Sequence, residues 1–312
     1  PIPNPQSPLQ YNWNKICTKF MQNIYKINFN IILKMSKIKN HEEEMIQSST
    51  PSIRIRLVRD FPEKEPVCLI VCHHGITMNL HFYDKFAKEM NEANIIIYRI
   101  DARGHGKSEG KRGHINSIFE MVEDLKIIVD LAKKENPNLP IFVIGHSMGG
   151  HVTALFATKY PNEVKGVITA AGLLKDTIHL FGDIPLKGDP ETLVPVNKAF
   201  QIKQIQDMDL EVLANVYPLF VSHLSISIMN SFVEGFEYLK QNRKKFVVPI
   251  LIFNGNCDYI VDQKDAIDFY TEIENKDKSL IIFSGVGHEL WNEEKGDMVI
   301  SHVLNWVQHR IK

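Results

Sequence analysis

The sequence predicts an α/β fold in which a mostly parallel β-sheet is flanked by helices and carries one helical insertion. Short apolar runs rich in β-branched residues recur from about residue 52, and stretches of helical periodicity lie between them. Continuous apolar runs are typical of parallel strands buried on both faces. A long segment of helical character between about residues 172 and 240 interrupts the series, which predicts an insertion after one strand.

The expected strands follow from these apolar runs. In residues 53–57 isoleucine and leucine alternate with arginine, which is typical of a strand with one exposed face. The later runs are uninterrupted and predict buried strands. They are Val67–Cys72, Ile95–Ile100, Ile141–Ile144, Val164–Ala170, Pro249–Phe253 and Leu280–Phe283.

The expected helices lie between the strands. Ser117 has the character of a helix N-cap, and Pro137 limits the helix that follows it. Asp262 has the same N-cap character ahead of another helical stretch. The predicted helices are Ser117–Lys134, Met148–Tyr160, Leu210–Tyr217, Phe220–Leu239, Asp262–Ile273 and a final one through Val299, Val303 and Trp306.

Composition excludes several classes of protein. The 312 residues are 44% hydrophobic and 23% charged, with a formal net charge of -1, so nothing in the overall charge favours nucleic acid as a partner. No apolar run approaches the roughly 18 residues that span a bilayer. Cys68 and Cys72 fall on one predicted strand roughly 13 Å apart, too far for a disulfide. We therefore expect a reducing, cytoplasmic location.

Residues 1–40 differ from the domain that we assign to residues 41–312. They contain six Lys and no Asp or Glu. Between residues 13 and 34, apolar and basic side chains fall on opposite faces of a helical wheel, a pattern that allows peripheral contact with a membrane surface. A low-complexity extension and a helix packed on the domain are the alternatives. The apolar face comprises Trp13, Ile16, Phe20, Ile24, Ile27 and Ile31.

The strongest local motif is Gly145-His-Ser147-Met-Gly149. It directly follows a predicted strand and precedes a predicted helix. A Gly-x-Ser-x-Gly sequence in that setting is a nucleophile elbow, in which a strained turn exposes the serine hydroxyl. The sequence therefore predicts that Ser147 is a catalytic nucleophile.

A serine nucleophile needs a base, and the base needs a group that orients it. Asp258 and His288 each come just after a later predicted strand, in the chain order that such folds use. Asp262 is the rival acid, although it has the character of a helix N-cap. His302 and His309 are rival bases, but they fall on the final helix. We therefore predict Asp258 and His288 as the partners of Ser147.

The oxyanion of an acyl-transfer intermediate needs two N–H donors. The residue after the nucleophile, Met148, supplies one in this kind of site. The loop His73-His74-Gly75-Ile76 follows an earlier strand, and we assign the second donor to Ile76. The two histidines could suggest a metal site, but no Cys or carboxylate lies nearby at ligand spacing. No metal and no cofactor are expected.

A second motif, Arg103-Gly-His-Gly-Lys-Ser108, ends like a phosphate-binding loop. Such a loop requires a glycine where this chain has Asp101, and it continues into a helix. Gly110 and Gly113 interrupt any helix here. Nucleotide binding is not expected.

Taken together, these motifs resemble the monoacylglycerol lipase and lysophospholipase branch of the α/β hydrolases, which is related to the serine aminopeptidases. The resemblance covers residues 52–312. It implies the α/β-hydrolase fold with an eight-stranded sheet, a lid that gates a lipid-facing acyl tunnel, and the Ser147, Asp258 and His288 triad. The matching pieces are His74-Gly75, Asp101–Gly110, Gly145–Gly150, Gly255–Asp258 and Gly287-His288.

One departure concerns the alcohol portion of the substrate. Monoacylglycerol lipases carry a Glu and, four residues on, an Arg near the glycerol pocket, whereas the matching positions here are Met78 and Phe82. Apolar side chains there favour a less polar alcohol or a broader esterase. His74, Met78 and Phe82 are the candidate substrate-binding residues.

The expected function is therefore that of a serine hydrolase on a small lipid or ester substrate, of the carboxylesterase, lysophospholipase or monoacylglycerol lipase type. One alternative is an aminopeptidase, which would need clustered acids in the lid. The lid acids Glu211, Glu234 and Glu237 are dispersed along the sequence. The other alternative is a non-catalytic scaffold, although no triad member is missing. The oligomeric state stays open.

Overall fold

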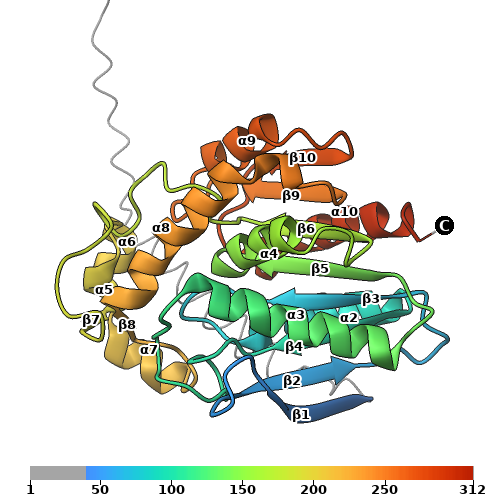
Figure 1. Ribbon diagram of the computed structural model, residues 1–312, viewed down its shortest axis with the longest axis horizontal. Coiled ribbons are helices and arrows are strands. Elements are labelled where there is room, and N and C mark those ends of the chain that lie inside the picture. The colour runs from blue at the N-terminus through green and yellow to red at the C-terminus, as the bar shows by residue number, and fades with distance from the viewer. Residues whose placement is uncertain (1–39, 312) are drawn as a thin grey trace, which may run out of the picture. The chain divides into compact units, whose positions relative to one another are not determined.

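The computed structural model describes residues 40–311, in which one sheet has helices on both faces (Figure 1). The strand order is β1-β2-β4-β3-β5-β6-β9-β10. β2 pairs antiparallel with β1 and with β4, and all other neighbours are parallel. The expected mostly parallel sheet of eight strands is confirmed. The strands are β1 (His41–Gln47), β2 (Arg54–Asp60), β3 (Cys68–His73), β4 (Ile95–Ile100), β5 (Ile141–His146), β6 (Gly166–Ala170), β9 (Ile250–Gly255) and β10 (Lys278–Phe283).

The central strands explain why their sequences are apolar throughout. Every residue of β3, β4, β5, β6 and β9 is buried, because helices cover both faces of the sheet. β10 lies at one edge and is only partly buried over most of its length.

The helices form two layers (Figure 1). α3 packs on α4 on one face, and α10 packs on α2. Ser117 caps α3 by accepting the Phe119 N–H, and Asp262 caps α9 by accepting the Lys264 N–H, so both expected N-caps are present. The helices and 3-10 turns are η1 (Leu80–Tyr83), α2 (Asp84–Glu92), α3 (Ile118–Glu135), α4 (Met148–Lys159), η2 (Arg243–Lys245), α9 (Gln263–Glu272), η3 (Leu290–Asn292) and α10 (Gly296–Gln308).

The insertion lies between β6 and β9, where the sequence predicts it. It is not purely helical, because β7 and β8 pair as a separate antiparallel ribbon. Its longest helix, α8, packs on α3 and α4 of the main domain. The elements are β7 (Leu193–Pro195), α5 (Val196–Ala199), α6 (Lys203–Gln206), α7 (Leu210–Val216), β8 (His223–Ser225) and α8 (Ile226–Gln241).

The expected basic extension over residues 1–40, with its membrane-facing helix over 13–34, lies almost entirely outside the described residues. Within residues 40–311, none of the helices combines the length and apolar character that crossing a bilayer requires.

Candidate active site

Ser147 lies at the sharp turn between β5 and α4. Its backbone has φ 54° and ψ −116°, a conformation that costs free energy for a residue with a side chain. The turn is held on both sides: the Ser147 N–H donates to the Ala170 carbonyl at 3.0 Å, and the Ser147 carbonyl accepts the Leu173 N–H at 3.2 Å. The strand, strained serine and helix that define a nucleophile elbow are all present.

Two glycines of the motif are required by close backbone approaches. A Cβ on Gly145 would lie 1.9 Å from the Gly149 carbonyl oxygen. A Cβ on Gly149 would lie 2.1 Å from the His73 carbonyl oxygen. Since real Cβ atoms cannot come so close to backbone oxygens, any side chain at either position would force β5, α4 and the end of β3 apart.

Asp258 and His288 meet at the ends of β9 and β10. The His288 Nδ1 donates to Asp258 Oδ2 at 2.8 Å, and the Asp258 side chain is fully buried. The other oxygen of Asp258 accepts the N–H groups of Ile260 and Val261 at 2.8 and 2.9 Å. The carboxylate is thus fixed by backbone donors on one side and orients the imidazole on the other.

The environment of His288 favours its protonated form. Burial opposes the charge, but the neighbouring Asp258 carboxylate and its hydrogen bond outweigh this, so the pKa of His288 is raised above 6.5. A histidine held in this way is a stronger base and stabilises the imidazolium that forms when it accepts a proton.

His288 also lies beside the elbow itself. Its ring centroid is 4.6 Å from that of His146, and its carbonyl is 2.9 Å from His146 Nε2. His146 directly precedes Ser147 in β5. The structure therefore brings the three predicted catalytic residues to one edge of the sheet, at the carboxyl ends of β5, β9 and β10.

The loop after β3 approaches the elbow from the other side. A Cβ on Gly75 would lie 3.1 Å from the Ser147 Cβ, so the loop backbone lies against the nucleophile. The N–H groups of Ile76 and Met148 donate no hydrogen bond to any residue in the described part of the chain. Their role as the two oxyanion donors therefore stays a prediction that these unpaired N–H groups allow.

Comparison with known proteins identifies the family. The family described as "Serine aminopeptidase, S33" matches residues 64–295, which is most of the chain and includes every residue of the site above. The chain belongs to this family.

Individual relatives in the family are lipases and esterases. A monoacylglycerol lipase of Mycolicibacterium smegmatis is 26% identical over 261 residues, covering 81% of this chain and 93% of the relative. The monoglyceride lipase of Homo sapiens is 26% identical over 260 residues, covering 80% and 85%. Caffeoylshikimate esterase of Arabidopsis thaliana is 23% identical over 246 residues, covering 74% of each chain. These relatives support an ester hydrolase of the lipase and esterase type.

Solved structures share the fold. A soluble variant of the Saccharomyces cerevisiae monoglyceride lipase superposes with a TM-score of 0.72 at 18% identity, covering 88% of this chain and 98% of that one. A thermostable carboxyl esterase from Bacillus coagulans gives a TM-score of 0.72 at 19% identity, covering 87% and 99%. The α/β-hydrolase fold expected from the sequence is confirmed.

The expected substrate-binding residues His74, Met78 and Phe82 lie near the elbow, and their contact with substrate stays a prediction. His74 is fully buried: its Nδ1 bonds the Gly75 carbonyl at 2.7 Å, and its Nε2 accepts the Ala102 N–H at 2.9 Å. Burial lowers the pKa of His74 to about 3, so the ring is neutral and braces two loops. Phe82 is 8% exposed, and its ring stacks on His146 with 4.2 Å between the ring centroids. Met78 is half-buried.

Sequence reasoning missed His146. Its ring is fully buried between Phe82 and His288, and burial lowers its pKa well below 6.5, so it is neutral. The only available signal was its place in the Gly-x-Ser-x-Gly motif, where the residue at x is not fixed by the turn. Its role depends on a residue 142 positions away.

The Asp101–Gly110 loop is built around the side chain of Asp101. The buried Asp101 carboxylate accepts the N–H groups of Leu80 and Lys107 at 2.7 and 2.8 Å. Gly106 has φ +50°, and a Cβ there would lie 2.1 Å from the Asp101 Cγ. The loop closes around its own carboxylate, so an anion would meet negative charge there. The structural role implied by the resemblance fits this arrangement.

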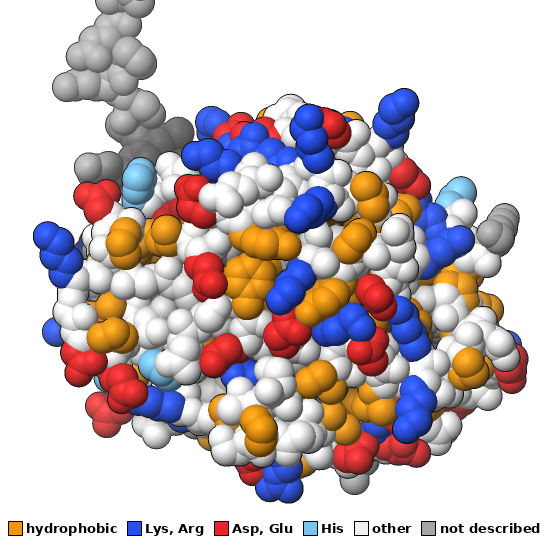
Figure 2. All heavy atoms as spheres, in the orientation of Figure 1, with side chains coloured by type: hydrophobic (Ala, Val, Ile, Leu, Met, Phe, Trp, Pro, Cys, Tyr) orange, Lys and Arg blue, Asp and Glu red, His pale blue; other side chains and the backbone are white. Residues whose placement is uncertain are grey.

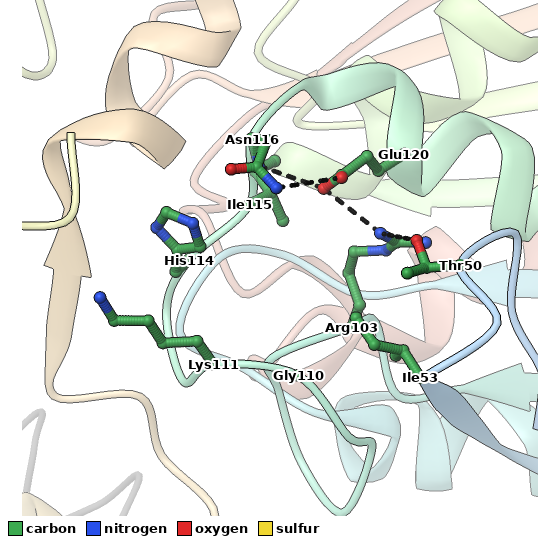
Figure 3. Close-up of a pocket in the computed structure, with 9 residues that line it drawn as sticks. All are labelled: Thr50, Ile53, Arg103, Gly110, Lys111, His114, Ile115, Asn116 and Glu120. Carbon is green, nitrogen blue, oxygen red and sulfur yellow. Dashed lines mark hydrogen bonds and ion pairs between the residues drawn. The ribbon is translucent and has the colours of Figure 1, made fainter.

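Two cavities among the described residues lie away from Ser147, which lines neither of them. One of about 90 Å³ lies beside the buried Arg103 (Figure 3). The other, of about 440 Å³, lies between α8, α9 and the chain after β6; apolar Leu174, Phe236 and Phe269 line it along with charged side chains.

On the face in Figure 2, exposed apolar side chains form small groups separated by charged ones. Among residues 40–311, no group of three or more His, Cys, Asp or Glu could hold a metal ion.

Proposed function

We propose that this chain is a serine ester hydrolase that cleaves carboxylic esters of apolar acyl chains through a Ser147, His288 and Asp258 triad. The observation that carries the proposal is the Asp258 to His288 hydrogen bond of 2.8 Å, formed beside the strained elbow of Ser147. A buried acid, an oriented histidine and a serine held in a strained turn at one edge of the sheet are the parts that acyl transfer needs.

The proposed reaction has two steps. His288 Nε2 takes the proton from Ser147 Oγ as the oxygen attacks the ester carbonyl, and the N–H groups of Met148 and Ile76 stabilise the tetrahedral oxyanion. As the intermediate collapses, the carbon–oxygen bond to the alcohol breaks, and His288 gives its proton to the departing alcohol. Water, activated by His288, then attacks the acyl-enzyme and releases the acid and Ser147. No cofactor takes part in this sequence.

Asp258 does not exchange protons in this scheme. It holds the His288 tautomer that carries hydrogen on Nδ1, which leaves Nε2 free to face the serine. It also stabilises the imidazolium that exists between the two proton transfers. The bonds from Ile260 and Val261 keep its second oxygen from turning away.

For the substrate, we propose a small lipid or a related ester with an apolar acyl chain. The M. smegmatis and human relatives are a monoacylglycerol lipase and a monoglyceride lipase. The alcohol portion is expected to be less polar than glycerol or broadly accepted, because Met78 and Phe82 supply no charge.

The same family includes aminopeptidases by name, but the insertion does not favour a substrate amine. Glu234 is used by Ser117, whose Oγ donates to it at 2.6 Å, and Glu237 pairs with Lys240 at 3.9 Å. These carboxylates have partners on their own elements or on the main domain. We therefore rank ester cleavage above peptide cleavage.

The test is turnover of p-nitrophenyl esters, monoacylglycerols, lysophospholipids and aminoacyl amides by the wild type and by Ser147→Ala. We expect ester turnover, labelling by a fluorophosphonate probe, and a loss of about 10⁴- to 10⁶-fold in kcat for Ser147→Ala. Ser301→Ala, which changes an exposed serine in α10, is the matched control. Ester hydrolysis retained by Ser147→Ala would reject the proposal, and faster release of aminoacyl amide products would favour the peptidase.

Peripheral membrane contact through residues 13–34, within an otherwise cytoplasmic protein, stays a prediction. Vesicle co-sedimentation of chains with and without residues 1–40 tests it. Equal pelleting of the two forms would contradict it.

A further inference from the structure

One carboxylate holds the backbone on both sides of His288. Glu293 Oε2 accepts the Gly287 N–H at 2.7 Å, and Glu293 Oε1 accepts the Glu289 N–H at 3.1 Å. A Cβ on Gly287 would lie 2.7 Å from Glu293 Oε1, so the close approach depends on glycine there. Glu293 follows the short turn η3, which folds the chain back beneath the His288 loop.

The peptide carbonyl of His288 is held from the opposite side. It accepts a hydrogen bond from His146 Nε2 at 2.9 Å, which requires the tautomer with hydrogen on Nε2. The His146 ring stacks on Phe82 with 4.2 Å between the two ring centroids, and this stacking fixes the plane of the His146 ring. The bond connects the residue before the nucleophile directly to the backbone of the base.

Three polar backbone groups around His288 are therefore paired with two buried or partly buried side chains. Asp258 fixes the imidazole ring, whereas Glu293 and His146 fix the peptide that carries it. A histidine on a loop has two side-chain torsions, and fixing Nδ1 alone leaves Nε2 free to swing about that bond. A displacement of about 1 Å at a reacting atom can cost about 100-fold in rate.

We propose that Glu293 is a positioning residue for His288, acting with His146 to hold the loop that presents Nε2 to Ser147. This inference rests on the proposed function. Glu293 touches neither the substrate nor the reacting atoms, so its effect is transmitted through the peptide groups at 287 and 289.

The chemistry of the position calls for a carboxylate. Two N–H donors converge on one side chain, and an ionised carboxylate offers an acceptor to each. A glutamine offers one acceptor oxygen and turns its NH₂ group toward the other N–H, so two donors face each other. An aspartate keeps the charge but is one methylene shorter and cannot reach both donors.

The charge of Glu293 also affects the pKa of His288, which simple loosening of the loop would not change. The groups facing His288 are Asp258 from the loop after β9, Glu289 and Glu293 from its own loop, and neutral His146 at the end of β5. Each carboxylate favours the protonated imidazole. Removing the charge of Glu293 therefore lowers the pKa of His288.

The test compares Glu293→Gln and Glu293→Asp with the wild type on a short p-nitrophenyl ester, with rates expressed per active site counted by burst titration. For Glu293→Gln we expect kcat to fall roughly 10- to 100-fold, KM to stay within about two-fold, and the acid limb of kcat/KM to move to lower pH. For Glu293→Asp we expect a similar fall in kcat with little movement of the acid limb. Glu294→Gln, the exposed neighbouring carboxylate, is the matched control and should match the wild type.

The outcomes separate this inference from the function beneath it. Wild-type kcat and pH profile in Glu293→Gln, with Ser147→Ala inactive, would overturn the positioning role and leave the triad standing. Activity in Ser147→Ala would remove the triad whatever Glu293 does. If Glu293→Gln yields no titratable sites, wild-type kcat in Glu293→Asp would still overturn the inference, because that variant also loses the paired backbone bonds.

Discussion

The imidazole of His151 occupies the space that a side chain at position 235 would need. A Cβ on Gly235 would lie 2.0 Å from His151 Nε2. His151 lies on α4, one turn after Ser147, and Gly235 lies in α8 of the insertion. Phe236 packs edge-on against the same ring at 4.9 Å. This contact joins the helix that begins at the nucleophile to the longest helix of the insertion.

Gly235→Ala should therefore destabilise the protein, although alanine has the higher helix propensity. Propensity alone would add about 1 kcal/mol of stability. Forcing α8 away from α4 should cost roughly 1–3 kcal/mol, more than that gain. Urea unfolding measures the net change, and we expect a lower midpoint with an unchanged slope.

Removing the opposing ring supplies the control. The double variant His151→Ala/Gly235→Ala has room for the new methyl group. Adding Gly235→Ala to His151→Ala should therefore cause no loss of stability, whereas adding it to the wild type should. A Gly235→Ala protein more stable than the wild type would show that α8 shifts freely, and that this contact does not fix the insertion.

The titration of His288 should set the acid limb of ester hydrolysis. The pKa of His288 is raised above 6.5, with burial opposing the shift and Asp258 causing it, and only neutral His288 can accept the serine proton. Activity should therefore fall as pH drops through a value above 6.5. In Asp258→Asn we expect kcat to fall by about 10⁴-fold and the limb to move to lower pH. The measurement is the full profile of kcat/KM against pH. An acid limb that stays at the same pH in Asp258→Asn would contradict the assignment of that limb to His288.

Arg103 should be difficult to replace even by lysine. Its guanidinium donates to both Asp124 oxygens at 2.7 and 2.8 Å and to Ser49 Oγ at 2.7 Å, next to the small cavity in Figure 3. Lysine cannot reproduce this planar set of bonds. Arg103→Lys should cost about 3 kcal/mol of unfolding free energy, since buried charges lose their partners.

Arg54 offers a matched control for this prediction. It pairs with Glu109 through the same two nitrogens, Nε and Nη2, which here donate to a single carboxylate oxygen, and its side chain is 56% exposed. Arg54→Lys should change stability by less than about 1 kcal/mol. Equal losses in the two variants, measured by urea unfolding, would show that burial is not what makes Arg103 important.

Asp265 should make stability depend on pH. Burial raises its pKa to about 7, opposed by hydrogen bonds from the Thr177 hydroxyl and N–H. In the unfolded chain the group ionises near 3.9. The stability that Asp265 contributes to the folded protein is therefore fully present below about pH 4. It is lost as pH rises toward 7, because the folded protein then retains a proton that the unfolded chain has released.

Asp265→Asn keeps the acceptor for Thr177 and removes the ionisation. The variant should gain stability relative to the wild type as pH rises from 4 to 8, by at most about 4 kcal/mol at the upper end. Asp183→Asn changes an exposed carboxylate and is the control. Its difference in stability from the wild type should stay the same across this pH range. Parallel unfolding curves for wild type and Asp265→Asn at all pH values would contradict the buried-acid explanation.

Much of the fold could be predicted because its signals are local. The strands at 95–100 and 141–146 are runs of apolar residues that only a sheet covered on both faces can bury, and Asp262 is a helix cap by its own chemistry. The alternation at 53–57 was a weaker guide. Arg56 in β2 is only 4% exposed, and it pairs with Glu43 of the neighbouring strand β1 and with Asp101, which directly follows the other neighbour, β4.

By itself, the sequence determined the nucleophile elbow at Ser147 and the order in which Asp258 and His288 follow it. Glycine spacing and strand ends are local signals that can be recognised from neighbouring residues. Only the tertiary structure decided that His74 accepts the Ala102 N–H, that β7 and β8 form a ribbon in the insertion, and that His146 bonds the backbone of His288. These outcomes depend on contacts between distant segments. A side chain that hydrogen-bonds a backbone group leaves no periodic pattern, since nearly any residue type can supply the peptide.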